Sequence, residues 1–213
     1  MNKHAASAPA VIFDVGNVLI RWDARLLYRQ LLPDEAAIDA FFAEVEFHDW
    51  NLGFDRGAAW DEGVAALSAR HPHRAPLIAA FHQRWHETVP GTVEGMPEVL
   101  AALTAGGVAL YAITNFSGDK WAETRERFPF LAAAFRDVVV SGHEGVVKPD
   151  PEIYRRCLER NGLEPAGSVF IDDSAANVAG AAALGIDAIR FTDAPSLVAA
   201  FRARGLPVPA GSA

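Results

Sequence analysis

Acidic residues end two of the apolar runs in this sequence, where their side chains could bind a cation or attack an electrophile. Asp14 comes directly after "VIF", and Asp172 and Asp173 close the run "SVFIDD". Short runs of β-branched and aromatic residues predict buried strands. A carboxylate at the rim of a core costs free energy unless it is paired or binds a metal. Several carboxylates at one place therefore predict a bound cation.

Further polar side chains follow the other predicted strands. Thr114 and Asn115 end the run "VALYAITN", and Lys148 lies in "SGHEGVVKPDP", ahead of a helix expected to begin near Pro149. In an open parallel sheet, ligands bind outside the carboxyl ends of the strands. Because these residues share that edge with the carboxylates, we expect a single polar site there.

The elements that must position these residues predict an α/β fold. Segments with helical spacing lie between the apolar runs, and each ends in glycine, as helix C-termini often do. This alternation predicts a doubly wound, Rossmann-like parallel sheet with helices on both faces. The expected strands cover residues 11–14, 108–114, 137–142, 168–173 and 187–191, and the expected helices cover residues 96–107, 151–162 and 174–185.

The stretch 21–90 breaks the alternation, because it holds helical patterns and no convincing strand. We expect it to form a small all-helical cap inserted after the first strand, with residues 1–20 and 91–213 forming the core domain. The helical patterns cover residues 24–32, 35–45, 57–70 and 76–89. Residues 46–63 are expected to form a loop-like break within the cap, and "VPGTVEGMP" is expected to lead back to the core.

Composition limits the classes of partner. The chain has 213 residues, 51% of them hydrophobic, and a formal net charge of -8. Such a charge provides no basic field for nucleic acid or for an anionic membrane, so we expect neither as a partner. The single cysteine, Cys157, excludes an internal disulfide framework. Since the first residues lack an apolar signal region, we expect a cytoplasmic protein.

The polar segments together resemble a known family. "FDVGNVL", "ITN", "KPDPEIY" and "VFIDDSAANVAGA" occur in this order and are similar to the four signature motifs of the haloacid dehalogenase (HAD) superfamily of hydrolases. The resemblance extends over nearly the whole chain. Within the family it is strongest to helical-cap phosphatases, including those acting on glucose 1-phosphate and the phosphatase domain of soluble epoxide hydrolase. It implies a small phosphorylated substrate.

The resemblance also implies roles for individual residues in phosphoryl transfer. Asp14 would be the nucleophile that forms an aspartyl phosphate, which water then hydrolyses. Thr114, through its hydroxyl, and Asn115, through a backbone or side-chain amide, would hold phosphate oxygens. Lys148 would neutralise charge on the nucleophile and on the transferring group.

A magnesium site is implied at the same sheet edge. Its ligands would be Asp14, the backbone carbonyl of Gly16 and Asp173. Asp172 would contact the ion either directly or through another ligand, and Asn177 would orient the loop. An anionic nucleophile and an anionic phosphate repel each other, and one Mg²⁺ with one lysine offsets that repulsion.

The sequence departs from the family pattern at Gly16, where most family phosphatases have an aspartate that serves as general acid and base. Such assistance contributes about 10²- to 10⁴-fold in rate. Three explanations stay open: a leaving group that needs little protonation, an acid supplied by the cap, or loss of phosphatase activity. The segment 46–63 offers candidates for a cap acid: His48, Asp49, Asp55 and Arg56.

Two of these cap residues are also predicted to bind substrate. His48 offers an imidazole, a side chain that often transfers protons in enzymes, but it could also be a surface or half-buried histidine. Arg56 could grip a substrate anion, or it could form a solvated ion pair with Asp55 or Glu62.

Two alternative functions remain at this point. A 2-haloacid dehalogenase would use Asp14 to attack carbon without a metal, but family dehalogenases usually carry an aromatic residue at the position of Gly16 and lack paired acids on the fourth strand. A non-catalytic phosphate- or partner-binding module would explain Gly16 but not the retained Asp14, Lys148 and Asp173. A magnesium-dependent phosphohydrolase fits these residues best.

Overall fold

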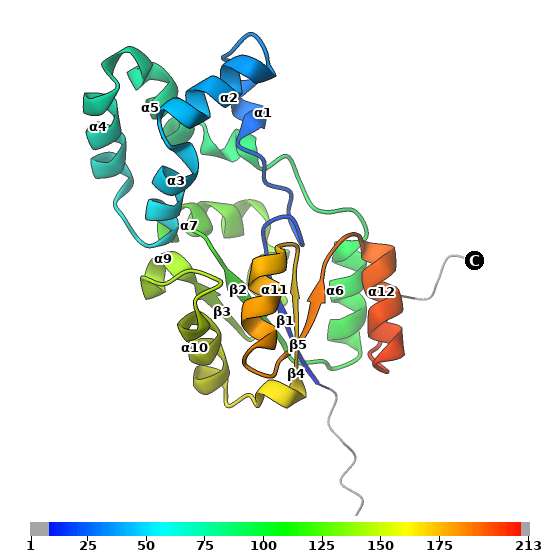
Figure 1. Cartoon of the computed structure of the whole chain (residues 1–213). Helices are drawn as coiled ribbons and strands as arrows, with labels where there is room; N and C mark the ends of the chain where they lie inside the picture. The colour runs from blue at the N-terminus through cyan, green and yellow to red at the C-terminus, as the bar shows by residue number, and fades with distance from the viewer. Residues whose placement is uncertain (1–8, 210–213) are drawn as a thin grey trace, which may run out of the picture.

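The centre of the molecule is a parallel sheet of five strands, described here from a computed structural model that covers residues 9–209 (Figure 1). The strands are β1 (Ala10–Phe13), β2 (Leu110–Thr114), β3 (Asp137–Val140), β4 (Ser168–Asp172) and β5 (Asp187–Arg190). Their order is β3-β2-β1-β4-β5, so that β1 lies between β2 and β4. Asp14, which directly follows β1, is therefore central at the carboxyl edge of the sheet.

Helices cover both faces of the sheet, as the alternating pattern predicts. Val11 and Phe13 of β1 pack toward α6 (Met96–Ala105) and α12 (Ala194–Ala203). Ile12, which points the other way, packs toward α10 (Pro151–Asn161) and α11 (Ala175–Ala182). These helices lie on opposite sides of the sheet in Figure 1. The three layers confirm the predicted doubly wound α/β fold.

A block of helices lies beyond the carboxyl ends of the strands (Figure 1). The chain enters and leaves this block through two paired segments, since the Arg21 backbone N–H donates to the Gly91 carbonyl (2.8 Å) and that of Asp23 to the Thr88 carbonyl (2.9 Å). The proposed domain boundaries at 21 and 90 stay a prediction. The block holds α1 (Arg25–Tyr28), α2 (Glu35–Glu44), α3 (Phe47–Asp55), α4 (Trp60–Arg70), α5 (Ala75–Gln83) and a short 3₁₀ turn, Trp85–Thr88.

The expectation of a loop-like break at residues 46–63 is wrong, because α3 (Phe47–Asp55) occupies half of it. Phe47 and Phe54 are buried, and the Trp50 and Phe54 rings lie 5.0 Å apart. Aromatic packing of this kind outweighs the roughly 1 kcal/mol cost of Gly53 in a helix interior.

Other helix boundaries also differ from the predicted ones. The pattern at 76–89 divides at Arg84, where α5 gives way to the 3₁₀ turn. By contrast, the helix expected at residues 151–162 begins at Pro151 as predicted, two residues after Pro149, and is capped by the side chain of Asp150. The core also contains three helices that we did not predict between β2 and the Lys148 loop: α7 (Gly118–Arg127), α8 (Phe130–Ala133) and α9 (Ser141–Glu144).

Within residues 9–209, every helix falls short of the length and apolar character that crossing a membrane requires. Cys157 is buried in the layer formed by α10, as expected for a packed core thiol. Burial raises the pKa of its thiol to about 12, which keeps it protonated near neutral pH.

Candidate active site

A tight loop at the end of β1 holds Asp14 in place. Its backbone N–H donates to the Ile171 carbonyl of β4 (2.8 Å), and its Oδ1 accepts a hydrogen bond from the Val15 N–H (2.6 Å). Asn17 adopts a left-handed conformation (φ 55°), which asparagine tolerates better than most residues. Its side-chain oxygen accepts from the Trp22 N–H (2.9 Å) and closes the loop. The Asp14 carboxylate thus has a fixed position at the sheet edge.

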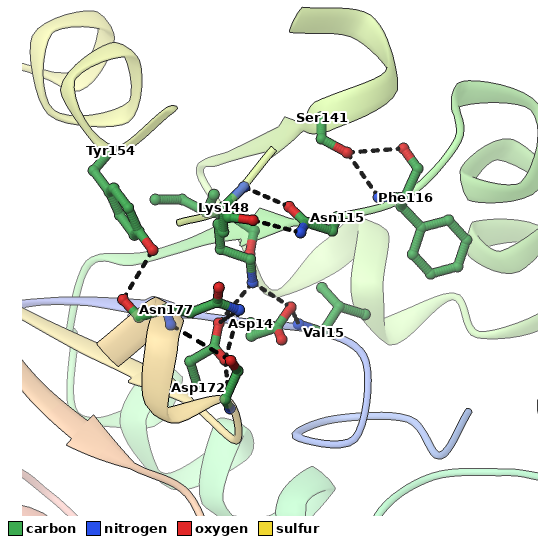
Figure 2. Close-up of polar contacts among 11 residues, drawn as sticks. Asp14, Val15, Asn115, Phe116, Ser141, Lys148, Tyr154, Asp172 and Asn177 are labelled. Carbon is green, nitrogen blue, oxygen red and sulfur yellow. Dashed lines mark hydrogen bonds and ion pairs between the residues drawn. The ribbon is translucent and has the colours of Figure 1, made fainter. Parts of the chain in front are cut away.

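Lys148 forms ion pairs with two carboxylates, those of Asp14 and Asp172 (Figure 2). Its Nζ lies 2.8 Å from Asp14 Oδ1 and 2.7 Å from Asp172 Oδ2, and it donates to the Ile113 carbonyl (2.9 Å). The lysine is 3% exposed. Its three ammonium protons therefore have three acceptors, and the side chain is held in a single direction.

The backbone of Lys148 is held by Asn115 (Figure 2). The Lys148 N–H donates to Asn115 Oδ1 (2.8 Å), and Asn115 Nδ2 donates to the Lys148 carbonyl (3.0 Å). The Asn115 side chain thus ties the loop of Lys148 to the end of β2. Of the two predicted phosphate-binding groups of Asn115, the backbone amide is therefore the better candidate.

Thr114, the last residue of β2, is 1% exposed. Within residues 9–209 its Oγ1 has no hydrogen-bond partner. A buried hydroxyl without a partner costs about 1–3 kcal/mol, and the Thr114 hydroxyl is therefore available to donate a hydrogen bond. Thr114 is not among the residues that line the cavity described below.

The contacts of Asp172 hold Lys148 and the turn after β4 in place, which we call its bracing role. It is completely buried, and its Oδ1 accepts from the Ser174 N–H (2.8 Å) and from Asn177 Nδ2 (3.0 Å), while Oδ2 faces Lys148. The Asn177 carbonyl accepts in turn from the Tyr154 hydroxyl (2.9 Å). Asn177 therefore connects the end of β4 to α10, and the loop-orienting role that the resemblance implies for it stays a prediction.

Negative charge is in excess at this edge. Asp14, Asp172 and Asp173 each offer an oxygen within 4.8 Å of the others, and Lys148 is the ammonium group that faces them. Burial raises the pKa of Asp14 to about 7, opposed by Lys148, and burial also raises the pKa of Asp173. Burial alone would lower the pKa of Lys148, but Asp14 and Asp172 raise it above its ordinary value. A divalent cation would relieve this excess.

A cavity of about 230 Å³ opens between this edge and the helical block. The core contributes Asp14, Lys148 and Asp173 to its walls. Helix α3 contributes residues at i, i+3, i+4 and i+7, which share one face of a helix. These are His48, Asn51, Leu52 and Asp55, and the aromatic wall consists of Trp22, Trp60, Trp85 and Phe116.

The structure brings most of the predicted site residues together. Gly16, Asn115, Asn177 and His48 also line the cavity, although His48 is an exposed residue of the first turn of α3. Arg56 is exposed and does not line this cavity, whereas its neighbour Asp55 does. Asn51, Leu52, Ser117 and Lys120 line the cavity and were not predicted.

Comparisons with known proteins identify a family and several relatives of this chain. A family model described as haloacid dehalogenase-like hydrolase matches residues 8–185. Sesquiterpene phosphatase astK of Aspergillus oryzae is 30% identical over 186 residues, which cover 86% of this chain and 90% of that protein. Acyl-CoA dehydrogenase family member 10 of Mus musculus is 28% identical over 198 residues, and the match spans 85% of this chain but 18% of that much longer protein.

Solved structures share the fold. A HAD family enzyme from Bacteroides thetaiotaomicron superposes with a TM-score of 0.73 at 20% identity, covering 91% of this chain and 98% of that one. The same wild-type enzyme, solved with magnesium and inorganic phosphate, superposes with a TM-score of 0.65.

The family match confirms the resemblance inferred from the four motifs, whereas the particular likeness to glucose 1-phosphate phosphatases and to soluble epoxide hydrolase stays a prediction. Solved structures at 20% identity establish the fold alone. The family match extends over most of the chain and includes the segments that carry Asp14, Lys148 and Asp173. The chain therefore belongs to the haloacid dehalogenase-like hydrolases.

Proposed function

We propose that this protein is a Mg²⁺-dependent phosphohydrolase that acts on a small phosphomonoester, such as a sugar phosphate. The observation that carries the proposal is the buried pair of Asp14 and Lys148, 2.8 Å apart at the floor of the cavity, with Asp173 beside it. A carboxylate nucleophile next to a fixed ammonium group suits attack on an anionic phosphate. A relative named as a phosphatase supports the same reaction class.

The donor set fits magnesium. Asp14, Asp173 and the Gly16 carbonyl offer hard oxygen ligands, which Mg²⁺ prefers. Asp172 belongs to the same acidic group, but its oxygens already accept hydrogen bonds from Ser174, Asn177 and Lys148, so we assign it the bracing role. When bound, the ion would offset charge on the phosphate and on the nucleophile.

The protein residues would then carry out a two-step transfer. An oxygen of Asp14 attacks phosphorus, the bond to the leaving oxygen breaks, and an aspartyl phosphate forms. Lys148 offsets negative charge during both steps. The Thr114 hydroxyl and the Asn115 backbone N–H would donate to phosphate oxygens. Water then attacks the phosphorus and releases Asp14 and inorganic phosphate.

Residues 21–90, as the cap, would close over the substrate. The cap side of the cavity consists of one face of α3 together with Trp22, Trp60 and Trp85. The Trp60 indole N–H donates to Ser117 Oγ (2.9 Å), which joins the cap to the core across the cavity. Such closure excludes water and selects substrates by shape.

The test of the function is phosphate release from sugar phosphates, acyl phosphates, an aryl phosphate and a sesquiterpenyl phosphate. We expect release that stops with a chelator and returns with Mg²⁺. A panel without any release, followed by halide release from 2-haloacids, would instead support the dehalogenase alternative. If neither phosphate nor halide were released, the non-catalytic binding module would be the remaining alternative.

Asp173→Asn is expected to raise the Mg²⁺ concentration for half-maximal activity about 10- to 100-fold, because it removes one charged ligand. Activity is titrated with Mg²⁺ for the variant and for the matched Asp61→Asn, whose side chain is 97% exposed on α4. An unchanged Mg²⁺ requirement in Asp173→Asn would exclude Asp173 as a ligand.

Thr114→Val is expected to weaken inhibition by inorganic phosphate about tenfold without lowering the free energy of unfolding. The substitution removes a buried hydroxyl that lacks a protein partner within residues 9–209, so stability has little to lose. The inhibition constant and a denaturant melt measure the two effects. Lower stability with unchanged phosphate inhibition would show that the hydroxyl is structural instead.

A further inference from the structure

The loop after β1 carries Gly16 where most family phosphatases have the aspartate that serves as general acid, and the space beside this glycine is open. A Cβ atom added at Gly16 would meet nothing within 4 Å. Steric crowding therefore does not explain the glycine. This space is open to a group from another wall of the cavity.

Asp55 is the cap carboxylate that lines the same cavity as Asp14 and Lys148. It is the last residue of α3 and half-buried, and its Oδ2 accepts a hydrogen bond from Asn51 Nδ2 (3.3 Å). The other candidates in this segment fit less well. Asp49 lies on the rim of a neighbouring hollow and His48 is exposed.

The backbone around Asp55 is fixed to the core. Its carbonyl accepts a hydrogen bond from Ser141 Oγ (2.6 Å), directly after β3. Gly57 approaches so closely that an added Cβ would lie 2.7 Å from the Gly142 carbonyl oxygen. These contacts hold Asp55 at a set position relative to the sheet edge, as acid catalysis requires.

The surroundings of Asp55 favour its protonated form. Partial burial raises the pKa of its carboxyl group to about 7, whereas Lys148 from the core and Arg56 from the cap act in the opposite direction. The C-terminal end of α3 also disfavours a negative charge there. A carboxyl group of this kind can both donate and accept a proton near neutral pH.

We propose that Asp55 is the general acid and base of this enzyme and takes over the role of the aspartate that most family phosphatases have at the position of Gly16. The proposal rests on the phosphatase function proposed above. As Asp14 forms its bond to phosphorus, the bond to the leaving oxygen breaks, and that oxygen takes the electron pair and the Asp55 proton to leave as an alcohol. Asp55 then accepts a proton from the water that attacks the aspartyl phosphate. Asp14 leaves as a carboxylate, and Asp55 is protonated again.

The test compares two esters of similar size, 4-nitrophenyl phosphate and 4-nitrobenzyl phosphate, in the presence of Mg²⁺. The first releases a stable phenolate, while the second releases an alkoxide that needs a proton. In Asp55→Asn we expect kcat/KM for the benzyl ester to fall about 10²- to 10⁴-fold and kcat/KM for the phenyl ester to fall less than about tenfold. Because kcat/KM reports the steps up to phosphoryl transfer, a defect in hydrolysis of the intermediate does not blur this comparison.

Two further variants complete the experiment. Asp49→Asn, on the same helix but outside this cavity, should leave both values unchanged. Gly16→Asp in the Asp55→Asn background should restore most of the benzyl ester turnover, since the position has room for a side chain.

Equal losses on the two esters, or no loss on either, would overturn the role of Asp55 while leaving the phosphatase function intact. Absence of phosphate release from every ester by the wild-type enzyme would overturn the phosphatase function itself. If Asp55→Asn fails to fold, Gly16→Asp in the otherwise native chain decides. A large gain specific to the benzyl ester would then mean that Asp55 supplies no acid, and no gain would support the proposal.

Discussion

Asp14→Asn is expected to lower phosphate release by at least about 10⁴-fold, because an amide cannot form the acyl phosphate and loss of a nucleophile typically removes most of the rate enhancement. The fold should persist. Lys148 keeps its bonds to Asp172 and to the Ile113 carbonyl in this variant, and asparagine has nearly the shape of aspartate. Release from an aryl phosphate and a thermal melt measure the two effects.

The control for Asp14→Asn is a rapid-quench search for the covalent intermediate. Wild-type enzyme stopped with acid during turnover should carry acid-stable, base-labile phosphate, and the variant should carry none. Near-normal rates in Asp14→Asn would rule out Asp14 as the nucleophile. If the Asp14→Asn protein still carried covalent phosphate, the phosphate would be attached to another residue.

The sheet was predictable because each strand carries a strong local signal. β1 (Ala10–Phe13) and β4 (Ser168–Asp172) are short and almost wholly apolar, as buried parallel strands are, and an aspartate directly follows β1 and ends β4. One strand boundary shifted at the turn after α6. The predicted strand begins at Val108, two residues before β2 (Leu110–Thr114), because the Val108 N–H still donates to the Leu103 carbonyl of α6 (3.0 Å).

The core half of the site was also predictable, because the topology of a parallel sheet brings its carboxyl ends together. The sequence alone does not reveal which partner each of these polar side chains contacts. Asp172 and Asp173 are adjacent and chemically equal, yet strand alternation buries Asp172 against Lys148 and turns Asp173 to the cavity. Likewise, the side-chain amide oxygen of Asn115 accepts a hydrogen bond from the backbone of Lys148, which is more than thirty residues away in the sequence.

The cap half of the site was not predictable at the same level. Gly53 and the charged residues of 46–63 concealed helix α3, whose stability comes from aromatic packing distant in sequence, such as Phe47 on Phe81 at 4.8 Å. Once α3 is seen as a helix, the spacing of His48, Asn51 and Asp55 places them on one face. The choice of Asp55 over Arg56 therefore depends on tertiary structure.

Lys148→Met is expected to lower the free energy of unfolding by about 3–5 kcal/mol and to abolish phosphate release. The substitution leaves Asp14 and Asp172 buried without their shared cation, and uncompensated buried charges are costly. The matched control is Lys120→Met, because Lys120 is also buried but pairs with the half-exposed Glu123. We expect a loss of about 1 kcal/mol there. Denaturant melts in chelator measure both variants.

A second substitution tests whether Lys148→Met loses stability through unpaired buried charge or through lost packing. It removes the charge of one of the two carboxylates that Lys148 pairs with. In the double variant Lys148→Met with Asp172→Asn, part of the lost stability should return, since a neutral amide keeps its bond to the Ser174 N–H without a buried charge. Mg²⁺ should also raise the melting temperature of Lys148→Met more than that of the wild type, because loss of the ammonium group strengthens cation binding by the remaining carboxylates. Additive losses in the double variant, with no added effect of Mg²⁺, would show that Lys148 contributes packing rather than charge.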